Sequence, residues 1–225
     1  PARAAAGAAE APRPRVQVRR APHDWEFHSD RPVIGVDEVG VGPIAGPMHA
    51  CAVMLKPGIT GADLPAVRDS KKMSRRARED CLESILDKSI HWICRSTRDT
   101  DRPGARLALL AECASAVKAV WVGAPPVVVV DGNLPVPGIF DQVCLVRGDD
   151  RCLEVACASV VAKVLRDRLM STLDAEFPVY GWIRGMGNPT EEHLEALETH
   201  GPCGHHRRGP TENAMRTWRN KRGKS

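Results

Sequence analysis

The sequence predicts one mixed α/β domain in which short buried strands lie between helices. Short apolar runs bounded by turn residues alternate with helix-length segments, which is the pattern of that fold class. The chain has 225 residues, of which 43% are hydrophobic and 27% are charged, and these values suit a single medium-sized globular domain. No stretch approaches the roughly 20 apolar residues that span a bilayer, so the sequence excludes a transmembrane protein.

The first half of the chain predicts three strands and a helix. Residues 33–36 and 49–55 are apolar runs joined by a turn rich in glycine and proline, which predicts two neighbouring strands. Ser74 can accept a hydrogen bond from a first-turn N–H, so we expect it to cap a helix that runs to about Lys88. Residues 91–97 alternate in the manner of a third strand.

The second half predicts two more strands and three more helices. Residues 105–120 are rich in Ala and Leu and predict a helix. Residues 127–130 are all valine, which predicts a buried strand, and residues 142–146 predict another. A long helix is expected over 151–176, where small residues allow close packing, and a capped helix over 189–199.

The ends of the chain are basic, whereas its body is acidic. Residues 1–22 carry a net charge of +4 and residues 216–225 carry +5, which leaves −5 for residues 23–215 out of the total of +4. Such ends either solubilise a protein or contact a polyanion, because neutralised phosphates release counterions.

These patterns divide the chain into three parts. We predict a disordered basic arm or transit remnant over 1–31, a folded domain over 32–208 and a basic C-terminal tail over 209–225. An Arg-rich, acid-poor start is typical of organellar transit segments. We therefore expect a mitochondrial or other organellar location, with nucleus and cytoplasm as the alternatives.

Cysteine and aromatic content exclude further classes of protein. The eight cysteines contain no C-x-x-C pair, which argues against a zinc site and a disulfide scaffold and fits a reducing compartment. Aromatic residues make up only 4% of the chain. A surface that binds nucleic acid mainly by stacking bases on aromatic rings is therefore not expected.

Four acidic residues follow predicted strands, namely Asp37, Glu38, Asp131 and Asp149. Sites in open α/β sheets form at the carboxyl ends of strands, and carboxylates gathered there repel one another unless cations compensate. Oxygen ligands suit Mg²⁺ or Mn²⁺, and two such ions can promote phosphodiester hydrolysis. Neighbours in a strand point to opposite faces, so Asp37 and Glu38 can share a site only if the strand ends there. The alternative is that these acids form turns or cap helices.

Six motifs then follow one another in a specific order. The segment at 35–47 reads GVDEVGVGPIAGP, and later segments read DSKKMS, VDGN, RGD with VACASVVAKVLRD, and FPVYGW, followed by PT, HL, GP and HRR. In this order, over about residues 33–208, they resemble the type 2 ribonucleases H, the ribonuclease HII family.

The resemblance implies a fold and an activity. The fold is RNase H-like, with a central five-stranded mixed sheet flanked by helices and a helical C-terminal extension. The activity is endonucleolytic cleavage of RNA in RNA–DNA hybrids, or at ribonucleotides embedded in duplex DNA, leaving 3′-hydroxyl and 5′-phosphate ends. Asp37, Glu38, Asp131 and Asp149 are the implied catalytic residues and the ligands of two Mg²⁺ or Mn²⁺ ions. The nucleic acid is the expected partner, and we expect a monomer.

Further residues are expected to contact the nucleic acid. The resemblance implies that a glycine turn reads the ribose 2′-hydroxyl through backbone groups, and the basic residues are candidate phosphate contacts, with a solvated surface as the alternative. The set is Gly40, Val41, Gly42, Ser70, Lys71, Lys72, Asn133, Lys163, Asn188, Arg207 and Arg208.

The substrate-recognition part departs from the family pattern. Val41 replaces the arginine of a G-R-G turn, and residues 185–188 replace H-K-G-Y, so the tyrosine that stacks on the sugar is lost. One stacking contact is worth about 1–3 kcal/mol. We therefore consider an enzyme with weakened junction recognition, a non-cleaving nucleic-acid-binding relative with a structural or assembly role, and a general nuclease of the same fold. Retention of all four acids favours the enzyme, because unused clustered acids destabilise a fold.

Overall fold

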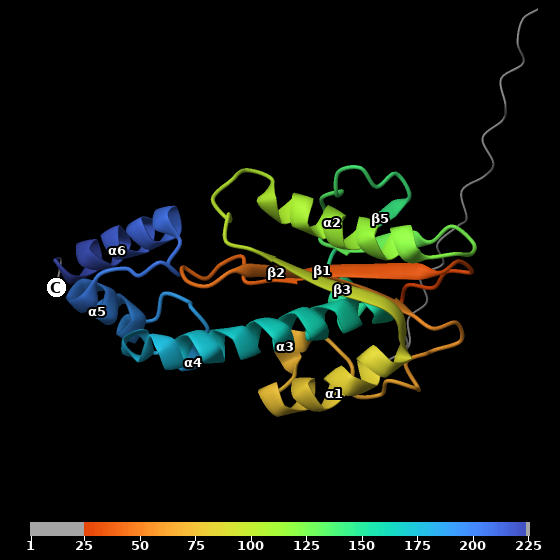
Figure 1. Cartoon of the computed structure of the whole chain (residues 1–225), viewed down its shortest axis with the longest axis horizontal. Helices are drawn as coiled ribbons and strands as arrows, with labels where there is room; N and C mark the ends of the chain where they lie inside the picture. The colour runs from red at the N-terminus through yellow and green to blue at the C-terminus, as the bar shows by residue number, and fades with distance from the viewer. Residues whose placement is uncertain (1–24, 224–225) are drawn as a thin grey trace, which may run out of the picture.

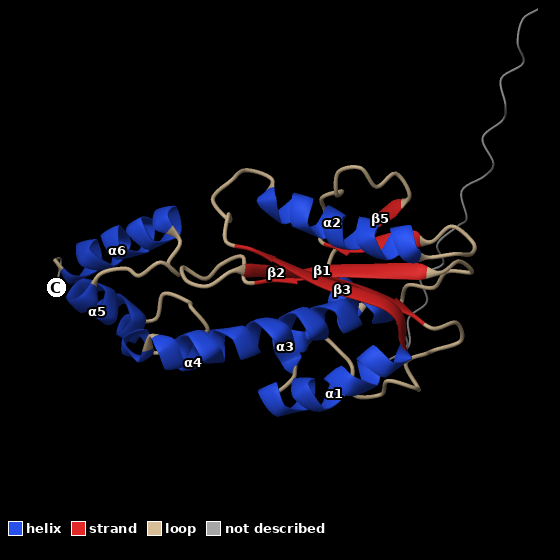
Figure 2. Ribbon diagram, viewed as in Figure 1, coloured by secondary structure: helices blue, strands red, loops and turns tan. Residues whose placement is uncertain are grey.

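A five-stranded mixed sheet forms the centre of the computed structural model, which describes residues 25–223 (Figures 1 and 2). The strands lie in the order β3-β2-β1-β4-β5. β2 is antiparallel to β1 and β3, whereas β1, β4 and β5 are parallel. The strands are β1 (Val33–Val39), β2 (Met48–Leu55), β3 (Ser89–Thr97), β4 (Val127–Asp131) and β5 (Gln142–Leu145). The predicted RNase H-like sheet is therefore confirmed.

Helices cover both faces of this sheet. α2 (Ala105–Val120) lies on one face, and α1 (Arg75–Lys88) and α3 (Leu153–Glu176) lie on the other (Figure 1). Along β1, Ile34 and Val36 pack with α2, so the intervening Gly35 faces α3. A Cβ atom on Gly35 would lie 2.1 Å from a backbone atom of α3. Glycine at this position therefore lets α3 approach the sheet closely.

The C-terminal part forms a helical extension at the far end of α3 (Figure 2). It contains α4 (Trp182–Gly185), α5 (Glu191–His200) and α6 (Arg208–Arg222). The predicted basic tail over 209–225 is therefore wrong for its described part: Met215 and Trp218 are buried in the core of the extension. Spaced three apart, they form the narrow apolar stripe of an otherwise basic helix.

The short 3₁₀ helices are η1 (Ser70–Lys72), η2 (Gly148–Asp150) and η3 (Pro178–Tyr180).

The N-terminal boundary of the folded part also differs from the prediction. Residues 1–24 of the predicted arm, like residues 224–225 at the other end, lie outside the described residues. Residues 25–31 belong to the fold, because Phe27 is buried and its backbone N–H donates to the carbonyl oxygen of Arg151 at 2.8 Å. Residues 25–31 therefore belong to the folded domain and not to the predicted arm.

Cysteines and hydropathy give two further results. Cys51 on β2 and Cys94 on β3 are opposite one another in the ladder and form a disulfide, a pair that the sequence, which argued against a disulfide scaffold, did not indicate. The other six cysteines are free.

Within residues 25–223, no helix has the length and apolar character that crossing a bilayer requires.

Candidate active site at the carboxyl ends of the strands

The four predicted acids come from three strand ends on one edge of the sheet. Asp37 and Glu38 lie near the end of β1, Asp131 ends β4, and Asp149 lies in η2 directly after β5. β1, β4 and β5 run parallel, so their carboxyl ends meet at the same edge. The topology therefore brings together acids that are more than 100 positions apart in the sequence.

Asp37 is the most enclosed of these acids. It is 4% exposed, and one of its oxygens, Oδ1, accepts the backbone N–H of Glu38 at 2.7 Å. Burial raises the pKa of Asp37 well above its usual value, and the negative charges of Glu38 and Asp131 raise it further. A hydrogen bond with Ser159 of α3 opposes this shift only in part. The charged form of Asp37 is therefore disfavoured by burial and by its acidic neighbours.

Asp131 and Asp149 are linked through a backbone turn. Asp131 Oδ1 accepts the N–H of Gly148 at 2.7 Å, which holds the turn that carries Asp149. Asp149 is also 4% exposed, and its Oδ2 atom has no hydrogen-bond partner. Burial raises the pKa of Asp149, and the nearby charge of Lys71 opposes the rise, with Lys71 Nζ 3.5 Å from Oδ2. A buried carboxylate oxygen without a donor is a position that a cation can fill.

Glu38 points to the opposite face of the sheet. β1 does not end at Asp37, since its pairing with β2 continues to Val39. Asp37 therefore faces α3, whereas Glu38 faces α2 and both of its oxygens accept hydrogen bonds from Arg106, at 2.7 and 3.0 Å. The condition that the strand ends at these residues is not met, because the antiparallel ladder extends past both acids.

The four acids have the ligand atoms that a hard divalent cation prefers, but in this structure they do not form a complete set of metal ligands. All their possible ligand atoms are carboxylate oxygens, which suit Mg²⁺ or Mn²⁺, and Asp149 has a buried oxygen that accepts no hydrogen bond. Among the described residues, no three His, Cys, Asp or Glu side chains form a group that could hold an ion as they stand. Binding of a cation therefore requires local movement of these side chains, Glu38 above all.

The predicted nucleic-acid contacts fall into two groups. Several are exposed to solvent near the acids or the glycine turns, among them Val41, Gly42, Lys71, Asn133 and Asn188. Others are paired within the protein. Ser70 is buried and its hydroxyl bonds to that of Ser159 at 2.9 Å. Lys72 Nζ lies 2.5 Å from Asp150, and Lys163 Nζ lies 2.6 Å from Asp167.

Arg207 requires a correction. It was predicted to contact phosphate, but it is 5% exposed. Its guanidinium donates to the carbonyl oxygens of Gly40, Val41 and Gly46. Arg207 therefore holds the glycine turn from inside, while the adjacent Arg208 is 91% exposed at its side chain and pairs with Glu212.

A second buried arginine, which the sequence did not single out, also binds backbone carbonyl groups of the glycine turn. Arg166 of α3 donates to the carbonyl oxygens of Pro47, Ala45 and Met186. It also packs against Gly40, where φ is +87° and a Cβ would lie 2.3 Å from Nε of Arg166. The signal that could have identified it is an arginine that directly follows the apolar stretch of α3. Arg166 thus ties the turn at 40–47 to the loop at 185–188.

That loop is also joined directly to the glycine turn. The carbonyl oxygen of Gly187 accepts the backbone N–H groups of Ile44 and Ala45, at 2.9 and 3.2 Å. Gly187 has φ of +81°, and a Cβ there would lie 2.4 Å from the carbonyl oxygen of Ala45. The two segments that depart from the family pattern are therefore one continuous structural unit.

Two histidines support this unit from the extension. Trp182 Nε1 donates to Nε2 of His193, which also lies 2.9 Å from Nε2 of His206, and His193 Nδ1 lies 2.8 Å from the carbonyl oxygen of Asn188. Burial and the neighbouring His193 lower the pKa of His206 to about 4. Both histidines are therefore neutral at pH 7, and their ring nitrogens take part in hydrogen bonds within the extension.

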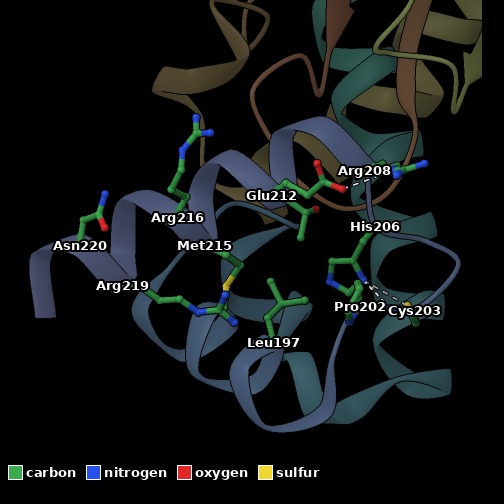
Figure 3. A pocket seen from close by; sticks show the side chains of 11 residues that line it. Leu197, Pro202, Cys203, His206, Arg208, Glu212, Met215, Arg216, Arg219 and Asn220 are labelled. Atoms are coloured by element: carbon green, nitrogen blue, oxygen red, sulfur yellow. Dashed lines mark hydrogen bonds and ion pairs between the residues drawn. The ribbon is translucent and has the colours of Figure 1, made fainter. Parts of the chain in front are cut away.

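The extension also contains a cavity of about 620 Å³ (Figure 3). Figure 3 shows the apolar side chains of Leu197 and Met215 within it, and arginines of α6 at its border. Two of these arginines are already paired, Arg208 with Glu212 and Arg219 with Glu198. None of the four strand-end acids lines the cavity, so it is separate from the candidate active site.

Comparison with known proteins agrees with this arrangement. A sequence model of the family described as Ribonuclease HII matches residues 34–209. Ribonuclease HII of Orientia tsutsugamushi (strain Ikeda) is 40% identical over 178 residues, which cover 78% of this chain and 83% of that protein.

Two solved structures share the fold. Ribonuclease H2 from Pyrococcus horikoshii OT3 has a TM-score of 0.66 and 21% identity, covering 84% of this chain and 99% of that chain. Bst-RNase HIII, solved in complex with Mn²⁺, has a TM-score of 0.63 and 16% identity, covering 89% and 77%. The family match and the 40% identity place this chain in the ribonuclease HII family, an endoribonuclease of the RNase H class that acts on RNA–DNA hybrids.

Proposed function

We propose that this chain hydrolyses the RNA strand of RNA–DNA hybrids, and ribonucleotides embedded in duplex DNA, with two divalent metal ions, leaving 3′-hydroxyl and 5′-phosphate ends. The observation that carries the proposal is the meeting of Asp37, Asp131 and Asp149 at one sheet edge, where burial raises the pKa of Asp37 and Asp149. A bound cation favours the charged form of such buried carboxylates.

Asp37, Glu38, Asp131 and Asp149 would hold the ions. Mg²⁺ or Mn²⁺, when bound, supplies a water of lowered pKa and stabilises charge on the departing 3′ oxygen. Bst-RNase HIII, which shares the fold, was solved with Mn²⁺. Asp149 Oδ2, which accepts no hydrogen bond and lies 3.5 Å from Lys71 Nζ, is available for this role.

The remaining residues would position the nucleic acid. Lys71 has a side chain that is 78% exposed and lies next to Asp149, so it can contact a phosphate beside the reacting bond. The turn at 40–42 presents backbone groups to the ribose, since Gly42 has no heavy atom within 4 Å of its Cβ position. Asn188 is exposed and can hydrogen-bond a 2′-hydroxyl.

Cleavage of an end-labelled duplex with a single ribonucleotide, in Mg²⁺ and in Mn²⁺, tests the proposal. We expect cleavage by the natural chain and by Asp141→Asn, an acid that is half-exposed and paired with Arg31. Asp131→Asn should lose activity by at least about a thousandfold, because a ligand of the catalytic ions is removed. Ligation of the downstream product without added kinase would identify its 5′-phosphate.

A non-cleaving nucleic-acid-binding protein is the second candidate. The pairing of Glu38 with Arg106 favours it, since this occupies one of the four acids. Hybrid binding without cleavage in either metal would support this candidate. Cleavage of an all-DNA duplex at the same rate would instead identify a general nuclease.

A further inference from the structure

Arg106, at the start of α2, holds the one acid that is turned away from the other three. Its Nε and Nη2 atoms donate to the two oxygens of Glu38 at 2.7 and 3.0 Å. The Glu38 side chain is 11% exposed and that of Arg106 is 31% exposed. This fork-to-fork geometry, partly shielded from water, makes the pair stronger than an ordinary surface ion pair.

The charge of Arg106 also acts on the neighbouring acids. Arg106 lies close enough to Glu38, Asp131 and Asp37 for its charge to interact with all three carboxylates. Its Nη2 lies 3.6 Å from the Cβ position of Gly132, directly after β4. The guanidinium therefore lies at the same sheet edge as the carboxylates.

We propose that Arg106 is an internal counter-cation that competes with divalent metal for Glu38 and so sets the metal affinity of the site. This inference rests on the proposed function, because it takes Glu38 as a metal ligand. A guanidinium and a divalent cation at the same carboxylate repel each other. Metal binding then requires Glu38 to exchange Arg106 for the ion.

The competition explains why the acids do not form a finished ligand set in the described residues. Lys71 places a second cation 3.5 Å from Asp149, but it is exposed and long, so it moves away readily. Arg106 is held by two hydrogen bonds and has to break both. It is thus a positioning residue that acts through Glu38.

Isothermal titration of the full chain with MnCl₂, without nucleic acid, tests the proposal. We expect Arg106→Leu and Arg106→Gln to bind Mn²⁺ about tenfold more tightly than the natural chain, as expected for removal of a charge-assisted pair. Arg102→Leu is the matched control: Arg102 precedes the same helix but pairs with Asp99 in solvent. It should leave the Mn²⁺ affinity unchanged.

A double-mutant cycle shows whether Arg106 acts through Glu38. In the Glu38→Gln background, Arg106→Leu should no longer tighten Mn²⁺ binding, because the competed ligand is gone. Thermal unfolding gives a second readout: the increase in Tm on adding Mn²⁺ should be larger for Arg106→Gln than for the natural chain. Arg106→Gln keeps a polar side chain without the charge, so this variant replaces Arg106→Leu in the experiment if Arg106→Leu does not fold.

Equal or weaker Mn²⁺ affinity in both Arg106 variants, with Arg102→Leu as reference, would overturn the inference. So would an equal gain in the Glu38→Gln background, because Arg106 would then act only as a general charge. Failure of the proposed function has a different signature, namely a natural chain that neither binds Mn²⁺ nor cleaves a hybrid.

Discussion

The guanidinium of Arg207 donates to the carbonyl oxygen of Gly40 at 2.6 Å, across 167 positions of sequence. The same side chain reaches the carbonyl oxygens of Val41 and Gly46. The turn predicted to read the ribose is therefore held by a residue at the start of the C-terminal extension. The predicted recognition turn and the extension are therefore linked through Arg207.

This coupling predicts opposite results for two adjacent arginines. Arg207→Ala should lower the free energy of unfolding by about 2–4 kcal/mol, because three carbonyl groups lose their donor, two of them in buried hydrogen bonds. Arg208→Ala should leave it unchanged within error, since the Arg208 side chain is solvated and its ion pair is exposed. Urea unfolding at pH 7.5 measures both. Equal effects of the two substitutions would contradict the assignment.

The raised pKa of Asp37 predicts how stability depends on pH without metal. Between its usual value of 3.8 and its raised value in the fold, the folded chain binds a proton that the unfolded chain has lost. Stability from this group is therefore present at low pH and is lost as pH rises through that window. Asn does not ionise, so the Asp37→Asn variant does not lose this stability as the pH rises. The Tm of the variant at pH 7 in EDTA should therefore exceed that of the natural chain.

Two controls accompany the Asp37 experiment. The Tm difference should shrink as the pH falls toward 3.8, because Asp37 is then protonated in both states. With Mn²⁺ the order should reverse, since only the natural chain keeps this ligand. A lower Tm for Asp37→Asn in EDTA at pH 7 would contradict the expected charge imbalance.

His206 predicts a separate loss of stability in acid. Burial, together with the charge that His193 would carry, lowers its pKa from 6.5 to about 4. The unfolded chain then takes up a proton that the folded chain does not, so this stabilisation is complete above pH 6.5 and falls as the pH drops toward 4. In urea unfolding across this range, His206→Gln should show a shallower dependence on pH. An unchanged slope would contradict this role.

Restoring the family residues in the recognition unit should sharpen substrate preference. Val41 is 52% exposed and Asn188 is exposed, so Val41→Arg with Asn188→Tyr adds side chains without disturbing the core. The ratio of cleavage at a single ribonucleotide to cleavage of an all-RNA hybrid should rise roughly tenfold. This factor corresponds to the binding free energy of one stacking contact. Val122→Arg, at a position that is 92% exposed, controls for added charge. An unchanged ratio would contradict the alignment of the loop.

The sequence determined the secondary structure closely, because local patterns carry that information. Ser74 caps α1 by accepting the N–H of Ala77, as its residue type and position predict. The valine run at 127–130 is a fully buried strand. The β1 prediction was three residues short, because polar Asp37 and Glu38 were read as the end of a strand that pairing with β2 extends.

The sequence by itself determined the family, the five strands and which acids lie at strand ends. The order of the motifs and the short apolar runs are properties of the sequence alone and need no knowledge of tertiary contacts. Only the tertiary structure decided that Glu38 faces Arg106 and that Arg207 is buried under the glycine turn. It also decided that residues 208–222 form a packed helix. These features depend on contacts between distant segments, whose partners no local pattern specifies.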